Sequence, residues 1–137
     1  MTELKSVSAQ DFRPFGNVID FLPGDASNFH IVDTDEEHPW RLAVFRYSNK
    51  EVTKIECHPT SKESFEPLSG LTVLLVAEHD TPEDYSAFIL DKPVVLAKGI
   101  WHQTLALTPE ASVKITENLE VESEFYTYTT PRRVVVM

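Results

Sequence analysis

The chain has 137 residues, 42% of them hydrophobic, and carries 12 basic against 22 acidic side chains, for a formal net charge of −10. This length and composition predict one globular domain over residues 1–137 and exclude a mostly disordered chain. The negative charge argues against nucleic acid and anionic membrane surfaces as partners. A small anionic substrate is not excluded, because a local cationic pocket can exist on an acidic protein.

Cys57 is the single cysteine in the sequence, so no intrachain disulfide can form. This pattern is typical of a reducing cytoplasm. The opening residues Met-Thr-Glu-Leu-Lys do not read as a secretion signal, and no apolar run approaches the length of a membrane span. We therefore expect a cytoplasmic protein without membrane partners.

The first part of the chain predicts one helical turn followed by a short strand. Ser8 is suited to cap a turn over residues 9–12, and Pro14 ends it. Gly16 permits the turn into a strand over residues 17–21. Residues 22–40 then contain turn residues and an acidic run, which predict a solvated loop.

The loop over residues 22–40 contains His30 and His38, which we expect on the surface. The next segment, residues 41–47, alternates as a strand, with Leu42, Val44 and Arg46 on one face. An arginine aligned with aliphatic residues lies either at a rim, reaching outward, or in a pocket that holds an anion.

Residues 52–58 predict a strand with a polar face, which carries Val52, Lys54, Glu56 and His58. Such a face lines a cavity or faces solvent. Cys57 lies on the other, apolar face and is expected to be a buried small hydrophobe. Trp101 is expected to pack beside the pocket.

Further short strands follow with little helical periodicity between them. They are expected over residues 71–77, 86–90, 93–96, 101–107, 112–116, 124–128 and 132–137. The run over residues 71–77 is almost continuously apolar, as in a strand covered on both faces. The pattern favours an all-β antiparallel barrel or sandwich.

Two polar fragments could form a single site. Glu56 and His58 are two residues apart and point to the same face of a strand, and Glu63 follows after a polar turn. His102 lies in a second fragment that begins at Gly99. If the fragments meet, these side chains could bind a divalent metal ion or form an acid/base pocket without one.

The spacing of these fragments resembles the two signature motifs of the cupin superfamily. The matching residues are Glu56, His58, Glu63 and Gly70 in the first motif, and Gly99 and His102 in the second. Glu56 stands where the superfamily more often has a first His. The usual Pro and Asn of the second motif are absent.

Beyond the cupin motifs, the ordered set of segments is similar to the ureidoglycolate lyase family. The matching segments are residues 8–19, 44–46, 56–59, 87–89 and 98–102, with Phe65 and Pro67. The resemblance implies a cupin-type double-stranded β-helix (a jelly-roll barrel), usually a homodimer. It also implies cleavage of ureidoglycolate to glyoxylate and urea in purine (allantoin) breakdown.

The chain departs from that family at three places near the expected site. Glu63 stands where the family typically has Gln, Gln103 where it has His, and Glu117-Asn118 where it has Asp-Arg. These departures keep two alternatives open. One is a cupin enzyme acting on another small carboxylated substrate, and the other is a non-catalytic binding protein with the same pocket.

The implied reaction assigns roles to the site residues. Breaking the C–N bond needs a base for the hydroxyl proton and an acid or a metal to help urea leave. His58 is the expected base because its ordinary pKa lies near neutral pH. Glu63 could hold His58 or bind metal, and His102 could bind metal or polarise the substrate. A single divalent ion would have the ligands Glu56, His58, Glu63 and His102, with its identity open among Mn, Fe, Ni and Zn.

The substrate carboxylate requires a cation, for which the candidates are Arg46, Lys62 and Lys98. The resemblance at residues 44–46 leads us to expect Arg46 inside the pocket. A homodimer is expected from apolar outer faces such as Ile55 and Cys57 and from the run over residues 134–136, which a lone barrel would leave partly exposed.

Overall fold

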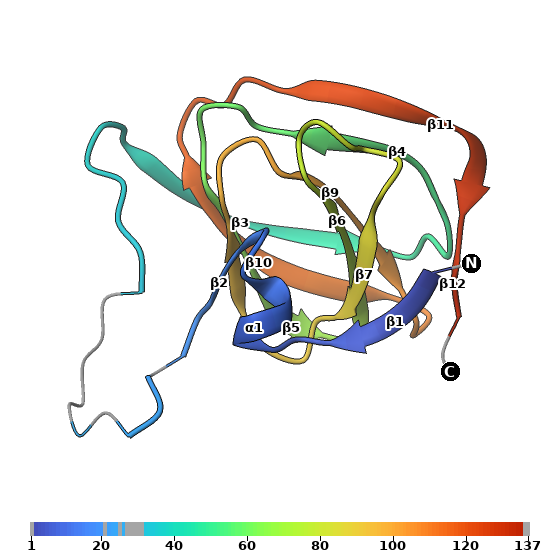
Figure 1. Ribbon diagram of the computed structural model, residues 1–137, viewed down its shortest axis with the longest axis horizontal. Coiled ribbons are helices and arrows are strands. Elements are labelled where there is room, and N and C mark those ends of the chain that lie inside the picture. Colours follow the sequence, from blue (N-terminus) through green and yellow to red (C-terminus); the bar gives the residue numbers. More distant parts are fainter. Residues whose placement is uncertain (1, 21, 25, 27–31, 136–137) are drawn as a thin grey trace.

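A computed structural model describes residues 2–20, 22–24, 26 and 32–135. Over these residues the chain forms two curved β-sheets and one short helix, α1 (Ala9–Phe12), that packs beside them (Figure 1). None of the described helices is long and apolar enough to cross a membrane.

The larger sheet has seven strands and nearly closes into a barrel. Their order is β11 (Glu124–Arg132), β4 (Val52–Cys57), β9 (Trp101–Ala106), β6 (Thr72–Ala77), β7 (Ser86–Ile89), β1 (Thr2–Ser6) and β12 (Val134–Val135). β11 and β12 follow each other in the chain but lie at opposite ends of this order. The C-terminal segment therefore crosses from one edge of the sheet to the other (Figure 1).

The smaller sheet has five strands and lies against the first. Its order is β2 (Gly16–Val18), β8 (Val94–Leu96), β5 (Glu63–Ser69), β10 (Ala111–Asn118) and β3 (Trp40–Tyr47). This all-β architecture confirms the expected fold class and is consistent with the cupin-type jelly roll. Ser8 caps α1 as predicted, because its Oγ accepts a hydrogen bond from the Asp11 amide at 3.1 Å.

Two strands were not anticipated, and some predicted boundaries differ. β1 is short and mostly polar, and β5 contains Pro67, so neither has a clear apolar alternation. The expected strand over residues 17–21 is shorter, and its last residue, Phe21, lies outside the described residues. So do His30, Val136 and Met137.

The apolar β6 separates two cores, which explains why its run is almost unbroken. Leu74 and Val76 pack into a core between the two sheets, and Val73 and Leu75 pack into a second core enclosed by the seven-stranded sheet. All six residues of β6 are buried, which confirms a strand covered on both faces.

β4 carries Glu56 and is followed directly by His58. The alternation of its side chains between the two faces is broken at its first residues. Val52 packs in the second core with Ile55 and Cys57, instead of sharing a face with Glu56. The pairing of β4 with β11 shifts register in this region, which accounts for the difference. From Ile55 onward the strict alternation holds.

Candidate active site

Four side chains that the sequence singled out approach one another where β4, β5 and β9 meet. Glu63 Oε1 lies 2.8 Å from His102 Nε2 and 3.4 Å from His58 Nε2. Glu56 is the cross-strand partner of His102, and one of its carboxylate oxygens lies within 4.8 Å of ring nitrogens of both histidines. The buried cluster thus combines two imidazoles with carboxylates from neighbouring strands.

Both imidazoles are held by backbone carbonyl groups. His58 Nδ1 lies 3.0 Å from the Glu122 carbonyl, and His102 Nδ1 lies 3.0 Å from the Ile100 carbonyl. A carbonyl can only accept, so each Nδ1 carries the proton. In its neutral form each ring therefore directs an Nε2 lone pair into the cluster, as a metal ligand or a base requires.

Gly99 helps to bring the second fragment beside the first. Its φ is +79°, a left-handed conformation that side chains with a Cβ rarely adopt. In this conformation its amide donates to the His58 carbonyl at 2.9 Å. The turn at Gly99 therefore ties the end of β4 to the start of β9, three residues before His102.

The charges of the cluster shift the pKa values of its members. Burial alone would lower the pKa of His58, but its hydrogen bond to Glu63 and the Glu63 charge outweigh burial and raise that pKa to about 9. The pKa of His102 also rises, because the negative charge of Glu63 overcomes burial. Burial alone would raise the pKa of Glu63, yet the two imidazoles lower it to about 2. One carboxylate thus serves as the counter-charge of two imidazoles, and such perturbed groups are typical of functional sites.

A fifth side chain, Glu117 of β10, belongs to the cluster; the family resemblance placed it near the site, but it was not predicted as a site residue. Its Oε1 lies 3.7 Å from His58 Nε2, and only 7% of its side chain is exposed. Its Oε2 accepts from Arg41 Nε at 3.0 Å and from Arg41 Nη2 at 2.6 Å. The signal was present in the sequence: Glu117 continues the buried face of Val113 and Ile115, but the predicted strand stopped at residue 116.

The cluster fits a divalent cation. Among the described residues, Glu63 Oε1, His102 Nε2 and Glu117 Oε1 are buried without a hydrogen-bond partner; the 2.8 Å contact between Glu63 and His102 is close but poorly aligned for a hydrogen bond. Ligand atoms of His58, Glu63 and Glu117 lie within 4.8 Å of one another, and so do ligand atoms of Glu56, His58 and His102. Imidazoles with carboxylates suit Mn, Fe, Ni or Zn.

The expectation that Arg46 lies inside the pocket is wrong. Its side chain is 75% exposed and lies 3.6 Å from Glu110 on the outer surface. Arg46 is paired with Ser112 on β10, so strand alternation places it on the face opposite to Glu117. The predicted alternation of β3 was correct, but it could not tell which face is the inner one. Arg41, five residues earlier, is the arginine that reaches the cluster.

The two candidate lysines lie near the site, but both form ion pairs with the loop that precedes β3. Lys62 Nζ contacts Asp33 Oδ1 at 2.6 Å, and Lys98 Nζ contacts Asp35 Oδ2 at 3.3 Å. Both lysines are therefore already neutralised by acidic residues of the segment that precedes β3. His38, in the same segment, is exposed as predicted.

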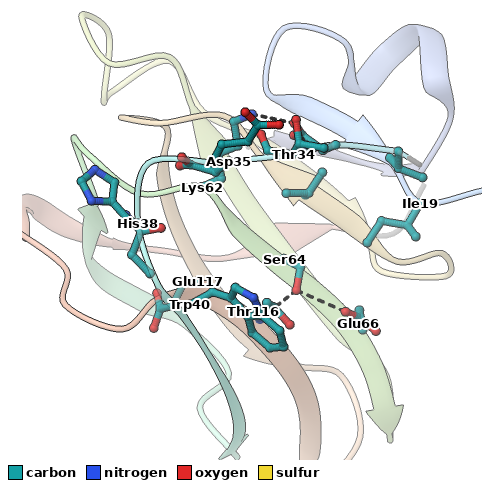
Figure 2. A pocket seen from close by; sticks show the side chains of 15 residues that line it. Ile19, Thr34, Asp35, His38, Trp40, Lys62, Ser64, Glu66, Thr116 and Glu117 are labelled. Atoms are coloured by element: carbon teal, nitrogen blue, oxygen red, sulfur yellow. Dashed lines mark hydrogen bonds and ion pairs between the residues drawn. The ribbon is translucent and has the colours of Figure 1, made fainter.

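A larger pocket, of about 630 Å³, lies under this loop and borders the buried cluster at Glu117, which belongs to both. Figure 2 shows Thr34 and Asp35 above the strands that carry Ser64 and Thr116. Ser64 and Thr116 belong to the outer face of the five-stranded sheet. Lys62 is the lysine among the lining residues, and Asp33 neutralises it, so the pocket does not favour an anion.

Comparison with known proteins gives two findings. The sequence model of the family described as ureidoglycolate lyase matches residues 1–131. A curated protein from Agrobacterium fabrum (strain C58 / ATCC 33970), named ureidoglycolate lyase, is 26% identical to this chain, with 75% of each chain covered.

Proposed function

Because the chain belongs to the ureidoglycolate lyase family, we propose that it cleaves ureidoglycolate to glyoxylate and urea. The observation that carries the proposal is the buried contact of Glu63 with both His58 and His102. Paired histidines with fixed Nδ1 protons and a shared carboxylate are suited to moving a proton between two atoms of a small substrate. We place the reaction in allantoin breakdown in the cytoplasm, where a reduced thiol such as Cys57 is stable.

His58 is the proposed proton carrier. Ureidoglycolate is a hemiaminal, so its hydroxyl must lose a proton as the C–N bond breaks, and the departing urea nitrogen must gain one. His58, whose pKa is raised to about 9, would do this from its neutral form, which becomes the main form as the pH rises toward 9. In that form a single imidazole can take the proton from the oxygen and deliver it to the nitrogen, so the reaction consumes no net acid or base. Glu63 stabilises the imidazolium that exists between the two transfers.

The same residues would hold a divalent ion. Its ligands would come from one of two overlapping groups, which are His58 with Glu63 and Glu117, or His58 with Glu56 and His102. When bound, the ion would act as a Lewis acid that polarises a substrate oxygen. The residues around the site fix the two imidazole rings. Phe65, whose ring packs edge-on against His102, excludes bulk water.

Arg41 replaces Arg46 as the proposed partner of the substrate carboxylate. Its Nε and Nη2 are bound to Glu117, and its side chain is 43% exposed. The guanidinium therefore lies between the buried cluster and solvent, with Nη1 free of hydrogen bonds to other described residues. Arginine suits this task because its planar fork matches a carboxylate.

The direct test is to incubate the purified protein with ureidoglycolate and to measure glyoxylate and urea separately. We expect equal amounts of both products, and a loss of about 10²-fold or more in kcat for His58→Ala. His38→Ala is the matched control, because His38 is an exposed histidine of the loop. Binding of ureidoglycolate without release of either product would contradict a lyase and favour a binding protein.

We further propose a homodimer, but through a different surface from the one expected. Ile55 and Cys57 are 1% and 0% exposed, so they cannot form an outer face. Exposed apolar residues instead follow the edge strand β3, where Trp40, Leu42 and Val44 are 65%, 53% and 72% exposed. An unpaired edge with an apolar face is suited to association with a second copy.

Sedimentation of the wild type should show a dimer at micromolar concentration. Val44→Glu should shift it to a monomer, because the charge would be buried without a partner in the interface. Phe125→Glu changes an aromatic residue that is 60% exposed on β11, in the other sheet, and should leave the dimer intact. A monomeric wild type would refute this proposal without bearing on the reaction.

A further inference from the structure

A second group of metal-binding side chains lies on the other face of β4. Cys57 stands between Glu56 and His58 in the chain, so its side chain points away from the first cluster and into the second core. Single ligand atoms of Cys57, His79 and Glu124 all lie within 4.8 Å of one another. The cleavage proposed above uses none of these three residues.

The spacing of the three ligand atoms approaches that of a bound ion. His79 Nε2 lies 3.7 Å from Glu124 Oε2. The ligands of a tetrahedral ion with bonds of about 2.0–2.3 Å are roughly 3.3–3.8 Å apart. The imidazole and the carboxylate are therefore already at ligand spacing, and the thiol needs only a small approach.

Cys57 and Glu124 are positioned by the pairing of their strands. They are direct cross-strand partners on β4 and β11. The Glu124 backbone amide faces the Cys57 sulfur as a hydrogen-bond donor, which favours the thiolate that a metal requires. Burial and the charges of Glu124 and Glu56 act in the other direction and keep the thiol protonated while no cation is present.

His79 is held on the opposite side by Trp101. Its ring stacks on the indole with centroids 5.7 Å apart and planes inclined by 10°, and Trp101 Nε1 donates to the His79 carbonyl at 2.8 Å. His79 Nδ1 lies 3.6 Å from Asp80 Oδ1. A carboxylate beside the second nitrogen of a metal-binding histidine is a common feature of zinc sites, because it fixes the ring and raises its basicity.

The plain alternative is a buried thiol under an unrelated surface ion pair. The combination of donor atoms argues against this alternative. The buried Cys57 thiol lies at the bottom of the group, and the half-exposed side chains of His79 and Glu124 lie between it and solvent. A surface ion pair has no need of a thiol pointing at it or of a histidine clamped on an indole. A thiolate, an imidazole and a carboxylate together select zinc-like ions over magnesium or calcium.

We propose that Cys57, His79 and Glu124 bind one zinc-like divalent ion, with solvent completing its coordination. The ion would connect β4, β11 and the segment between β6 and β7. This makes it a structural clip at the end of the second core. The site lies across β4 from the candidate active site and does not depend on the reaction that site performs.

Cobalt(II) titration of the metal-free full-length chain tests the proposal, because cobalt bound to a thiolate has a charge-transfer band that nitrogen and oxygen ligands do not produce. We expect this band in the wild type and in His58→Ala, which removes a ligand of the first cluster only. Cys57→Ser should abolish it. Because a change at a buried residue could disturb folding, Glu124→Gln and His79→Gln provide the second measurement, with zinc affinity expected to fall by about tenfold or more.

The zinc measurement should also show one ion fewer per chain in Cys57→Ser than in the wild type. A wild-type cobalt spectrum without the thiolate band would overturn the proposal. So would equal zinc affinity in the wild type, Glu124→Gln and His79→Gln. Thermal unfolding with and without zinc adds an activity-independent readout: zinc should raise the Tm of His58→Ala but not that of the double variant His58→Ala/Cys57→Ser, which lacks a ligand of each group.

Discussion

The two faces of the five-stranded sheet carry similar residue types but use them differently. On the inner face, Glu63 and Glu117 are buried, and each has an oxygen without a hydrogen bond to the described residues. On the outer face, Glu66 accepts from Ser64 Oγ at 3.2 Å and lies 3.2 Å from Lys114 Nζ, in a partly exposed setting. The larger pocket is on the outer face. A buried polar atom that lacks a partner is therefore a better guide to chemistry here than the size of a hollow.

The sharpest way to test this contrast uses two glutamates of β5. Glu63→Gln introduces the residue that the family typically has at this position. It should still lower kcat/KM by about 10²-fold or more, because in this chain a neutral amide cannot stabilise the imidazolium of His58. The same change should reduce the amount of divalent metal that copurifies. Steady-state kinetics and metal analysis measure the two effects.

Glu66→Gln is the matched control for Glu63→Gln. It makes the same chemical change on the outer face of the same strand, where only the Lys114 pair and the Ser64 hydrogen bond are lost. It should leave kcat/KM within about twofold of the wild type, since exposed pairs contribute little. Equal losses in both variants would remove the distinction between the faces.

Two arginines of β3 provide the second comparison. Arg41→Ala should raise KM for ureidoglycolate by about 10- to 100-fold, the amount expected for a charge-assisted hydrogen bond to a carboxylate. Arg46→Ala should leave KM unchanged, because its side chain faces outward. If Arg46→Ala produced the larger change in KM, the assignment of the inner face would be wrong.

The pH dependence of stability gives a third test, on the protein freed of metal. The pKa of His58 is raised from its ordinary value to about 9, so its contribution is complete below about 6.5 and is lost as the pH rises through 9. The pKa of Glu63 is lowered to about 2, so its contribution is complete above about 4.5 and is lost as the pH falls toward 2. Stability should therefore be highest between these limits and should fall by about 1–2 kcal/mol toward pH 9.

Urea unfolding at pH 6 and pH 9 measures this change. A saturating divalent ion should cancel the alkaline loss, because the ion binds the deprotonated imidazoles and its affinity rises with pH. His58→Phe should show a weaker alkaline decline than the wild type. An unchanged free energy of unfolding across this range would show that the cluster does not couple proton binding to folding.

The smallest effect is expected at the loop anchor. Lys62→Ala removes the ion pair with Asp33, in which both side chains are partly exposed. The free energy of unfolding should change by no more than about 1 kcal/mol, because partly exposed ion pairs are screened by solvent. KM should remain within about twofold. A rise in KM as large as that of Arg41→Ala would restore Lys62 as a substrate-binding residue.

The sequence predicted the strands and the meeting of the two motifs, because both depend on local patterns. Strand alternation and turn residues located most of the sheet, and the i, i+2 spacing aligned Glu56 with His58. The inner or outer position of a face is a property of the sheet, so Arg46 was misplaced. The buried state of Ile55 depends on β11 closing over β4, a pairing between segments far apart in the chain.

Glu117 shows a different limit. It lies on β10, where Val113 and Ile115 mark the buried face. Glu117 is the next residue on that face, and an acidic side chain there suggests that the strand has ended. Only the side chains that pair with it show that the strand continues. Here the partners are His58 and Arg41, which come from two other strands.

The path of the C-terminal segment affects how the molecule can assemble on the ribosome. β4 pairs with β11, and β1 pairs with β12, so both edges of the seven-stranded sheet stay open until β11 and β12 have been synthesised. Until then the nascent chain exposes two open strand edges, which can pair with other chains. Closure links distant parts of the sequence and should be slow compared with the formation of local hairpins. The strand that carries Glu56 therefore acquires its final neighbour only after β11 has left the ribosome, and holding-type chaperones can protect its open edge in that interval.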